Sequence, residues 1–377
     1  MFRLILDAMG GDHGPRTVLE GVVLALPELL TSAGELIIVG NKKVMDSLLK
    51  KHRLKPLKDA LEGKFGFPSP FVVRMIHTSE TIDGEDSIST IRRKPNAAIN
   101  FGCELAAKNY QAMRNPFQMK DQPLPEGIMP TAFISAGHSG AVMTSALVQM
   151  GRLAHVERPA IAIKLPTLSP DGCVLIDVGA NVDCKPEHLR DFAIMGAIFA
   201  QTERSQPGLP RVALLSNGEE RKKGNELTRA SAVLIEKLHC LKGGLNSVGE
   251  FLGYAEGKEI FKGQIDVVVT DGFVGNVVLK ALEGLGSAVT TILKKEAKRN
   301  PLTTLGFLLA AGVFARFKRR LDYAEYGAAP LLGVAGYVFI CHGRSNSKAI
   351  KNALLRAKTG IKSRFMERLE QTLEHTT

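Results

Sequence analysis

The chain has 377 residues, of which 45% are hydrophobic and 23% are charged, a composition typical of a soluble globular protein with two or three domains. Lysine and arginine outnumber aspartate and glutamate by 49 to 38, and the net charge of +11 suits nucleic acid, an anionic membrane, an acidic protein or a phosphorylated ligand as partner. The five cysteines form no C-x-x-C pair, and no apolar run approaches the about 20 residues that span a bilayer, so disulfide scaffolds, structural zinc sites and membrane spans are not expected.

The first predicted element is a buried strand at residues 2–7, which ends in the loop Asp7-Ala-Met-Gly-Gly-Asp-His13. Because the chain opens on a strand and not on a basic and apolar leader, we expect a cytoplasmic protein. Val18, Leu19 and Val22 recur at helical spacing and predict a helix over 17–30.

The next predicted elements are a strand at 35–39, a helix at 43–52 and a strand at 71–76. Between the helix and the second strand, residues 56–70 are rich in Pro, Gly and Lys and predict a loop. The basic triplet Arg92-Arg93-Lys94 stands at the predicted start of a helix over 96–109, where it could face a ligand phosphate, an acidic partner or only solvent. Four prolines between 115 and 130 predict a surface insertion.

A strand at 132–134 leads into Ser135-Ala-Gly-His-Ser-Gly-Ala141, where Ser139 beside His138 invites interpretation as a nucleophile. The loop does not match G-x-S-x-G, and adjacent residues on a turn rarely form a serine–base pair. Ser139 as the N-cap of the following helix is a common alternative. We favour a third interpretation, in which Ser139 and the loop amides hold an anion.

The strand at 174–178 runs through Asp177, and Gly179, Ala180 and Asn181 then turn the chain with little side-chain bulk. Lys185 precedes a proline that suits the first turn of a helix. Such a turn directs backbone N–H groups and the positive end of a helix dipole beyond the strand.

A strand at 212–215 is followed by a densely charged stretch at 219–227, in which Glu219 and Glu220 could form a metal or acid–base site. Mixed charges over so short a span are more often solvated. The last strand, at 266–270, opens into Asp271-Gly-Phe-Val-Gly-Asn276. Because loops at the carboxyl ends of strands lie together in an open α/β sheet, we predict that the four strand-end loops form one anion-binding crevice.

An apolar segment follows at 301–321. Five of its apolar side chains fall on one helical stripe: Leu305, Leu308, Leu309, Val313 and Phe317. Four basic residues lie at the end of this stripe: Arg316, Lys318, Arg319 and Arg320. An apolar helix too short to span a bilayer and ended by positive charge is typical of an interfacial membrane segment, and a helix at a dimer interface or in a core fits as well.

Several ordered blocks resemble the bacterial phosphate acyltransferases of phospholipid synthesis. They are Asp7-Ala-Met-Gly-Gly-Asp-His13, Arg92-Arg93-Lys94, Gly151-Arg152, Arg158-Pro159-Ala160, Asp177-Val-Gly-Ala-Asn-Val-Asp183, Lys185-Pro-Glu-His-Leu189, Lys223-Gly-Asn-Glu-Leu227, Thr270-Asp-Gly-Phe-Val-Gly-Asn276 and His342-Gly343. Together they cover nearly the whole chain. The third loop departs from the family pattern, because His138 and Ser139 stand where Asn and Thr are usual.

The resemblance implies an enzyme that moves a fatty acyl group from acyl carrier protein to inorganic phosphate, forming acyl phosphate for phosphatidic acid synthesis. It implies an α/β fold, a three-layer α/β/α sandwich with a mostly parallel sheet, similar to isocitrate and isopropylmalate dehydrogenases and to phosphotransacetylase. Residues 1–377 would then form a single catalytic domain, in two lobes if it is divided, with a protruding helical hairpin at 285–322.

The resemblance also implies a homodimer without cofactor or metal. It would contact the inner face of the plasma membrane peripherally, near a glycerol-3-phosphate acyltransferase that consumes the product. The membrane tip is expected at Leu305, Phe307, Leu308, Leu309, Val313 and Phe314. Basic clusters at 92–94, 221–223 and 294–295 would give the acidic carrier protein a docking surface.

In the expected reaction, bound phosphate attacks the thioester carbonyl directly, because a thiol with an ordinary pKa of ~8.5 leaves without strong acid help. The protein then positions the reactants and stabilises the oxyanion. The expected phosphate-binding residues are Gly10, Gly11, Gly137, Ser139, Gly140, Gly179, Asn181 and Gly275. The expected catalytic groups are His13, Lys185, Asn225 and Asn276, although His13 could equally order its own loop. The loops are expected to be ordered by Asp7, Asp12, Asp177 and Asp271.

Two alternatives remain at this point. A metal- and nicotinamide-dependent decarboxylating dehydrogenase of the same fold would need a carboxylate cluster and an adenine-binding loop, and the sequence has neither convincingly. A basic nucleic-acid-binding module would need an aromatic-studded basic face, whereas Trp is absent and only five Tyr are present, so nucleic acid is not expected as a partner.

Overall fold

The computed structural model describes residues 1–64, 70–82, 86–114, 127–205 and 207–375. The chain divides into two compact units. Unit 1 comprises Met1–Ala162 and Tyr326–Thr377, and unit 2 comprises Ile163–Glu325. Most of the predicted insertion at 115–130 lies outside the described residues.

The sheet of unit 1 is mostly parallel. Neighbouring strands follow the order β3 (Phe71–His77), β2 (Gly34–Gly40), β1 (Arg3–Asp7), β4 (Thr131–Ser135), β11 (Tyr337–Cys341), β10 (Ala328–Leu332) and β5 (Ala160–Leu165). Among these described strands, β10 runs antiparallel to its two neighbours. The apolar runs predicted from the sequence at 4–6 and 132–134 are completely buried in β1 and β4, as central parallel strands require.

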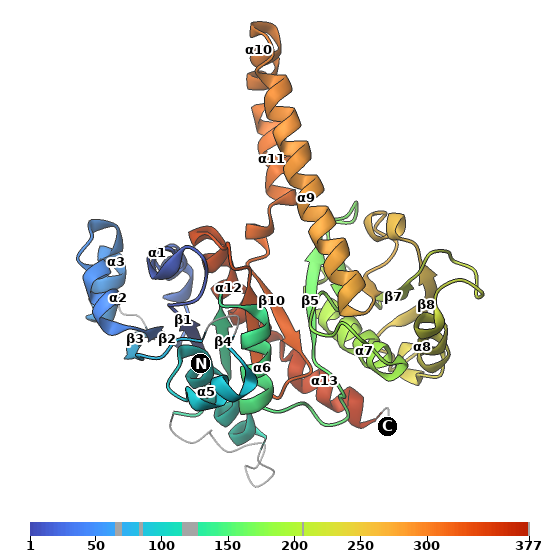
Figure 1. Ribbon diagram of the computed structural model, residues 1–377, viewed down its shortest axis with the longest axis horizontal. Coiled ribbons are helices and arrows are strands. Elements are labelled where there is room, and N and C mark those ends of the chain that lie inside the picture. Colours follow the sequence, from blue (N-terminus) through green and yellow to red (C-terminus); the bar gives the residue numbers. More distant parts are fainter. Residues whose placement is uncertain (65–69, 83–85, 115–126, 206, 376–377) are drawn as a thin grey trace. The chain divides into compact units, whose positions relative to one another are not determined.

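Helices cover both faces of this sheet (Figure 1). A side chain at Gly102 would collide with Phe133 of β4, whereas one at Gly360 would collide with Phe339 of β11. Phe133 pairs with Val338 in the parallel register, so Phe133 and Phe339 point to opposite faces. The two glycines belong to different helices, which therefore lie on opposite sides of the sheet. The predicted α/β/α layering is confirmed. The helices of unit 1 are α1 (Gly14–Leu29), α2 (Lys42–Leu49), α3 (Lys55–Leu61), α4 (Ile88–Arg93), α5 (Ala98–Met113), α6 (Ser139–Gln149), α12 (Ser347–Ser363) and α13 (Phe365–Glu374).

The sheet of unit 2 is built from parallel strands in the order β6 (Cys173–Ile176), β9 (Val267–Val269), β7 (Arg211–Leu215) and β8 (Glu250–Ala255). Helix α7 (Pro186–Glu203) packs on β6 and β9, because Gly196 leaves room for Val267 and Ile176. Helix α8 (Glu226–Glu236) packs beside α7. The carboxyl ends of β6 and β9 carry two of the predicted site loops.

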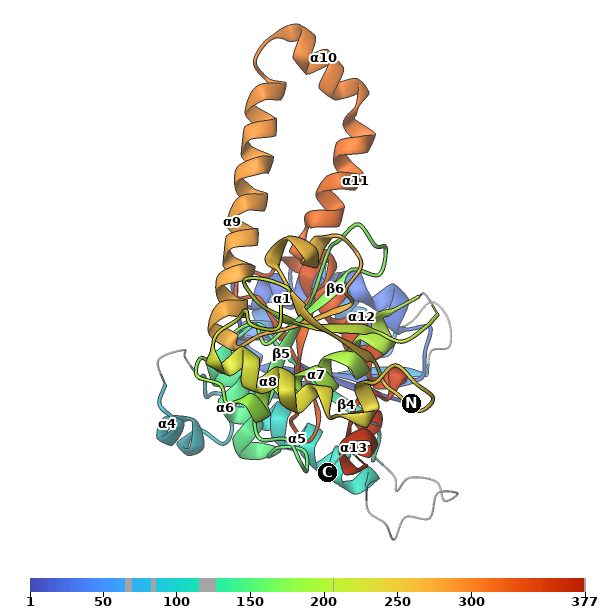
Figure 2. The same cartoon turned by 90° about the vertical axis from the view of Figure 1, so that its right-hand side faces the viewer.

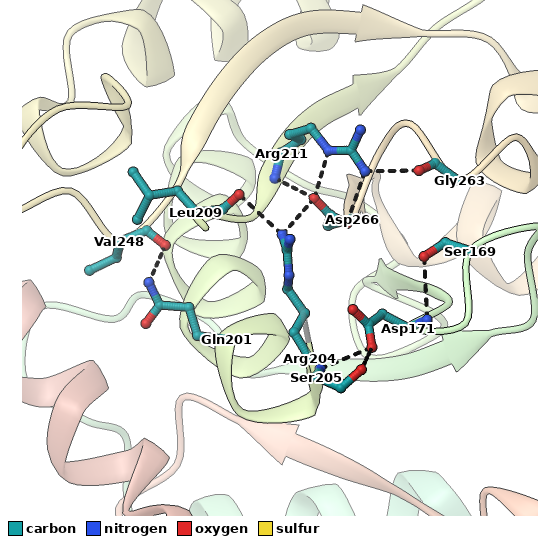
Figure 3. Close-up of polar contacts among 10 residues, drawn as sticks. All are labelled: Ser169, Asp171, Gln201, Arg204, Ser205, Leu209, Arg211, Val248, Gly263 and Asp266. Atoms are coloured by element: carbon teal, nitrogen blue, oxygen red, sulfur yellow. Dashed lines mark hydrogen bonds and ion pairs between the residues drawn. The ribbon is translucent and has the colours of Figure 1, made fainter. Parts of the chain in front are cut away.

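An ion-pair cluster holds the opposite, amino-terminal edge of this sheet (Figure 3). The buried carboxylate of Asp266 accepts hydrogen bonds from Arg204 Nη1 at 2.8 Å and from Arg211 Nε at 2.9 Å. Nearby, Asp171 accepts from the backbone N–H and the hydroxyl of Ser205 at 2.9 and 2.6 Å. These contacts join the end of α7 to the strand starts, so the cluster braces the side of unit 2 away from the site loops.

Three helices of unit 2 form an arm that leads away from its sheet (Figure 2). Helix α9 (Gly272–Ala297) leads outward, α10 (Pro301–Leu309) lies at the far end, and α11 (Ala311–Leu321) returns. The sequence predicted a single helical stripe through this tip, but the chain bends at Ala310. The rings of Phe307 and Phe314 stack across the bend with centroids 3.8 Å apart, so these two predicted tip residues pack on each other.

Three sequence expectations need correction. The predicted loop at 56–70 begins with α3, because Pro56 occupies a first-turn position that tolerates proline. Arg92 and Arg93 end α4 and do not start the next helix, an arrangement that the helix dipole favours. Within the described residues α9 is long and apolar enough to cross a membrane by length and composition, and none of its apolar stretch is buried. Asn276, Lys280 and Glu283 interrupt the apolar residues of α9, so the sequence shows no continuous apolar run there.

Candidate active site

The loop after β6 is built around one buried carboxylate. Asp177 is fully buried, and its Oδ1 accepts the backbone N–H groups of Gly179 at 3.2 Å and Ala180 at 3.0 Å. Its Oδ2 accepts the backbone N–H of Asn181 at 2.8 Å and the side-chain Nδ2 of Asn181 at 2.9 Å. Four donors around one carboxylate hold the loop in a single conformation.

The amino end of α9 packs directly on this loop. The N–H of Gly272 donates to the carbonyl of Asn181 at 2.7 Å, and a side chain at Gly275 would overlap the carbonyl oxygen of Asp177. Asn276 lies 3.8 Å from the position that a Cβ would take on Gly179. Two glycines one helical turn apart therefore allow backbone-to-backbone contact, and Asn276 is placed beside the loop.

The loop after β1 in unit 1 follows the same design. Asp7 is buried, and its Oδ1 accepts the N–H groups of Met9 at 2.9 Å and Gly10 at 3.2 Å. Its Oδ2 accepts the hydroxyl of Ser135, at the end of β4, at 2.7 Å. Burial raises the pKa of Asp7 above its ordinary value, and the hydrogen bond from Ser135 opposes that rise. The carboxylate joins two adjacent strand-end loops.

A third loop of unit 1 belongs to the same cluster, and sequence reasoning gave it no role in the site. The carbonyl of Gly343, just after β11, accepts the N–H of Asp12 at 2.8 Å. A Cβ on Gly11 would lie 3.3 Å from that same carbonyl oxygen and 3.2 Å from Ala136. The loops after β1, β4 and β11 therefore meet within unit 1. The pair His342-Gly343 was visible in the sequence, but only the pairing of β11 with β4 places it beside Asp12.

Comparison with known proteins identifies the family of this chain. A family model described as fatty acid synthesis protein matches residues 2–114 and 121–368. The phosphate acyltransferase of Geotalea daltonii is 40% identical over 374 residues, which are 98% of this chain and 94% of that protein. The phosphate acyltransferase of Wolinella succinogenes is 39% identical over 369 residues, 98% of this chain and 97% of that protein. This chain belongs to the phosphate acyltransferase family.

The fold of this transferase is shared with more distant proteins. The EutD phosphotransacetylase from Staphylococcus aureus superposes with a TM-score of 0.54 at 14% identity, covering 96% of this chain and 94% of that one. A phosphotransacetylase from Streptococcus pyogenes gives a TM-score of 0.50 at 17% identity, with coverage of 96% and 94%. These likenesses concern the fold alone.

Several glycine N–H groups that the sequence offered to phosphate already have acceptors inside the acyltransferase. Gly10 donates to Asp7, Gly179 donates to Asp177, Gly137 donates to Ser135 Oγ at 3.0 Å, and Gly275 donates to the carbonyl of Asp271 at 3.0 Å. The glycines act instead by letting backbones pass closely. The amino end of α6, at Ser139 and Gly140, keeps first-turn N–H groups that have no acceptor within the helix.

Two predicted donor side chains are also engaged. Asn181 Nδ2 donates to Asp177 Oδ2 at 2.9 Å, so this carboxamide is bonded within its own loop. Asn225 caps α8, where its Oδ1 accepts the N–H and the hydroxyl of Thr228, both at 2.8 Å. Asn225 lies in the connection from β7 to α8 and forms the N-cap of α8.

The remaining predicted residues stand at helix starts. Lys185 and His13 are exposed and precede α7 and α1. His188 reaches back to accept the N–H of Lys185 at its Nδ1, 3.1 Å away, a contact the sequence did not reveal. Asp271 caps α9 by accepting the N–H of Val274 at 2.9 Å. Asp12 contributes its backbone N–H to the Gly343 contact, and its side chain is exposed.

The loop between β4 and α6 corrects one sequence interpretation. Helix α6 begins at Ser139, so the N-cap position belongs to His138 and not to Ser139. The His138 ring lies over the first turn, with Cε1 and Nδ1 each 3.3 Å from the position of a Cβ on Gly140. Ser139 is exposed, which leaves its hydroxyl accessible to a ligand.

Glu219, for which the sequence left a metal or acid–base role open, lies beside Glu259. The hydrogen bond and charge of Glu259 raise the pKa of Glu219. Within the residues that the structure describes, no three His, Cys, Asp or Glu side chains are grouped as a metal site. The loops meet in two sets, one in each unit, and their union into one crevice stays a prediction.

Proposed function

We propose that this enzyme transfers a fatty acyl group from acyl carrier protein to inorganic phosphate and releases acyl phosphate. Full-length similarity to phosphate acyltransferases supports the acceptor, and the match to the fatty acid synthesis model supports the class of acyl group. The observation that carries the proposal is the pair of aspartate-centred loops, which fix polar groups at strand ends in both units.

In the proposed reaction an oxygen of bound phosphate attacks the thioester carbonyl carbon, the carbon–sulfur bond breaks, and the thiol of the carrier leaves. Ser139 Oγ and the first-turn N–H groups of α6 hold phosphate, since a helix amino end favours an anion. Lys185 and Asn276, both next to the Asp177 loop, donate to the developing oxyanion. His13, at the end of the β1 loop, takes the proton that hydrogen phosphate loses and returns it to the departing thiolate of the carrier.

The test is direct. Purified protein is incubated with acyl-carrier thioester, with and without phosphate, and any acyl phosphate is trapped with hydroxylamine. We expect hydroxamate only when phosphate is present, and Ser139→Ala should raise the KM for phosphate about tenfold through loss of one hydrogen bond to a charged ligand. Ser287→Ala, an exposed serine on α9, is the matched control and should leave that KM unchanged. Phosphate-independent thioester loss in the wild type would refute the proposal.

We propose that the carrier protein docks on the basic side chains at the end of α4. Arg92 and Arg93 are exposed at the end of α4, whereas Arg221 is paired with Glu236 at 2.9 Å on the surface. The first two are therefore the better docking groups. Replacing both with Glu should lower kcat/KM for the carrier thioester and weaken its salt dependence, with little effect on a pantetheine thioester. Equal loss with both donors would contradict docking here.

We propose that the arm of unit 2 attaches the enzyme to the inner face of the plasma membrane. Leu302, Leu305, Leu308 and Leu309 are between 56% and 83% exposed on α10. Exposed leucines beside Arg316 and Arg319 suit an interface with anionic lipid. Joint replacement of Leu308 and Leu309 by Ser should abolish flotation with anionic vesicles, while Leu168→Ser, 80% exposed elsewhere in unit 2, should not. Unchanged flotation of the double variant would contradict attachment by this tip.

We also propose a homodimer that pairs the outer part of α9. Leu285 and Ile292 are 61% and 59% exposed, two turns apart on the same helix. Burial against a second copy would remove this apolar surface from water. Light scattering should give twice the chain mass for the wild type and the single mass for a double Asp variant of Leu285 and Ile292. A monomeric wild type at all concentrations would refute the dimer.

A further inference from the structure

Three exposed apolar side chains surround the contact between α9 and the Asp177 loop. Val182 is 60% exposed, Phe273 is 60% exposed and Val277 is 52% exposed. We infer that these three side chains form the subsite for the first methylene groups of the acyl chain and thereby set acyl-chain preference. The inference rests on the proposed function and concerns the same site.

A backbone hydrogen bond brings together the two chain segments that carry these side chains. The N–H of Gly272 donates to the carbonyl of Asn181 at 2.7 Å, and Phe273 and Val182 are the next residues after that bonded pair. Val277 follows Phe273 by four positions, so both lie on one face of α9 about 6 Å apart along its axis. The apolar group is therefore continuous with the loop that carries Asn181.

The chemistry of the substrate indicates which group binds to these three side chains. The thioester carbonyl must lie at the strand-end loops to react, and its alkyl chain starts at the same carbon. The alkyl chain of the thioester therefore leaves the reacting carbon along the apolar surface that begins beside Asn181 and Asn276. Contact between the alkyl chain and this surface removes apolar area of both from water. Farther along α9, Lys280 is paired with Glu283 at 3.0 Å, which ends the apolar surface of the first two turns.

The subsite is held in place before substrate arrives. Asp271 caps α9 at Val274, and Gly272 and Gly275 hold the first turn against the Asp177 loop. Contact with a fixed apolar face loses little conformational entropy on binding. The same packing leaves Phe273 and Val277 facing outward, because the buried positions of the first turn are the two glycines.

The experiment compares acetyl and palmitoyl thioesters of acyl carrier protein in wild type, Phe273→Ala and Val277→Ala. We expect each variant to lose about tenfold in kcat/KM for the palmitoyl donor, mainly through KM, and to keep its rate with the acetyl donor. Val233→Ala on α8, also 52% exposed, is the matched control and should retain the wild-type ratio of the two donors. Equal loss with both donors in Phe273→Ala and Val277→Ala would overturn the inference.

Two further results distinguish this inference from the proposed function and from the proposed dimer. A wild type that forms no acyl phosphate from either donor would refute the proposed function, whereas a wild type that is active with both and variants with an unchanged donor ratio would refute the subsite alone. Light scattering on the same variants adds a check, because loss of the dimer with no change in donor ratio would assign this face to a second copy of the chain and overturn the inference.

Discussion

The contact between Gly275 and the Asp177 loop predicts that Gly275→Ala is destabilising. An added Cβ would overlap the carbonyl oxygen of Asp177, and would lie 2.9 Å from its carbonyl carbon and 3.1 Å from Thr270 Cγ2, where ordinary contacts begin at 3.4 Å. The first neighbour is backbone, held by the four hydrogen bonds to the Asp177 carboxylate, so the helix must move away instead.

The size of the effect follows from what that movement breaks. Overpacking costs about 1–3 kcal/mol, and loss of the Gly272 N–H bond to Asn181 adds about 1 kcal/mol. The better helix propensity of Ala returns about 1 kcal/mol. We therefore expect a net loss of about 1–3 kcal/mol in the free energy of unfolding, together with loss of phosphate-dependent turnover as Asn276 shifts.

The matched control lies on the same helix. A Cβ added to Gly284 would have no neighbouring atom within 4 Å, so Gly284→Ala should stabilise the protein by up to about 1 kcal/mol and leave turnover intact. Urea unfolding followed by circular dichroism and the hydroxylamine assay measure both variants. If Gly275→Ala were as stable and as active as Gly284→Ala, the close packing of α9 on the loop would be wrong.

Two other changes test the carboxylates. Asp177→Ala removes the acceptor of three loop N–H groups and of the Asn181 side-chain amide, so it should lower the free energy of unfolding by about 3 kcal/mol or more and abolish turnover. Asp183→Ala, which changes an exposed carboxylate of the same loop, is the control and should alter neither stability nor turnover. Urea unfolding and the hydroxylamine trapping assay measure both variants. Burial raises the pKa of Glu370 above 4.5, against the opposing charge of Arg114. The folded state then binds its proton more tightly than the unfolded state, so stability should fall as pH rises through the window just above 4.5, and Glu370→Gln should flatten that slope in unfolding titrations; an unchanged slope would contradict this account.

The sequence predicted the strands and their loops because both are local patterns. Short apolar runs before Asp7, Ser135, Asp177 and Thr270, each followed by small and turn-forming residues, are typical of buried strands, and these runs lie in β1, β4, β6 and β9. The apolar tip of the arm was also visible as an apolar stretch with basic residues. Its bend at Ala310 was not, because the apolar spacing continues unbroken through it.

Donor assignments within the loops could not be predicted in this way. Whether the N–H of Gly10 or Gly179 is available to phosphate depends on where the aspartate three or two residues earlier turns its carboxylate, and in both loops it turns back on the loop. The cap of α8 uses Asn225 Oδ1 as an acceptor and so fixes this side chain at the start of that helix, which the sequence did not indicate. A residue type states what a side chain can donate or accept, and only the folded chain decides what it has already bonded.

The sequence alone thus determined the fold class, the family and the set of candidate site loops. It could do so because the alternation of apolar runs with glycine-rich turns is a local pattern. The tertiary structure alone decided which of those residues touch. Ser135 meets Asp7 from 128 positions away at 2.7 Å, and Gly343 meets Asp12 through a strand added near the end of the chain. Such contacts depend on strand order, which no local pattern encodes.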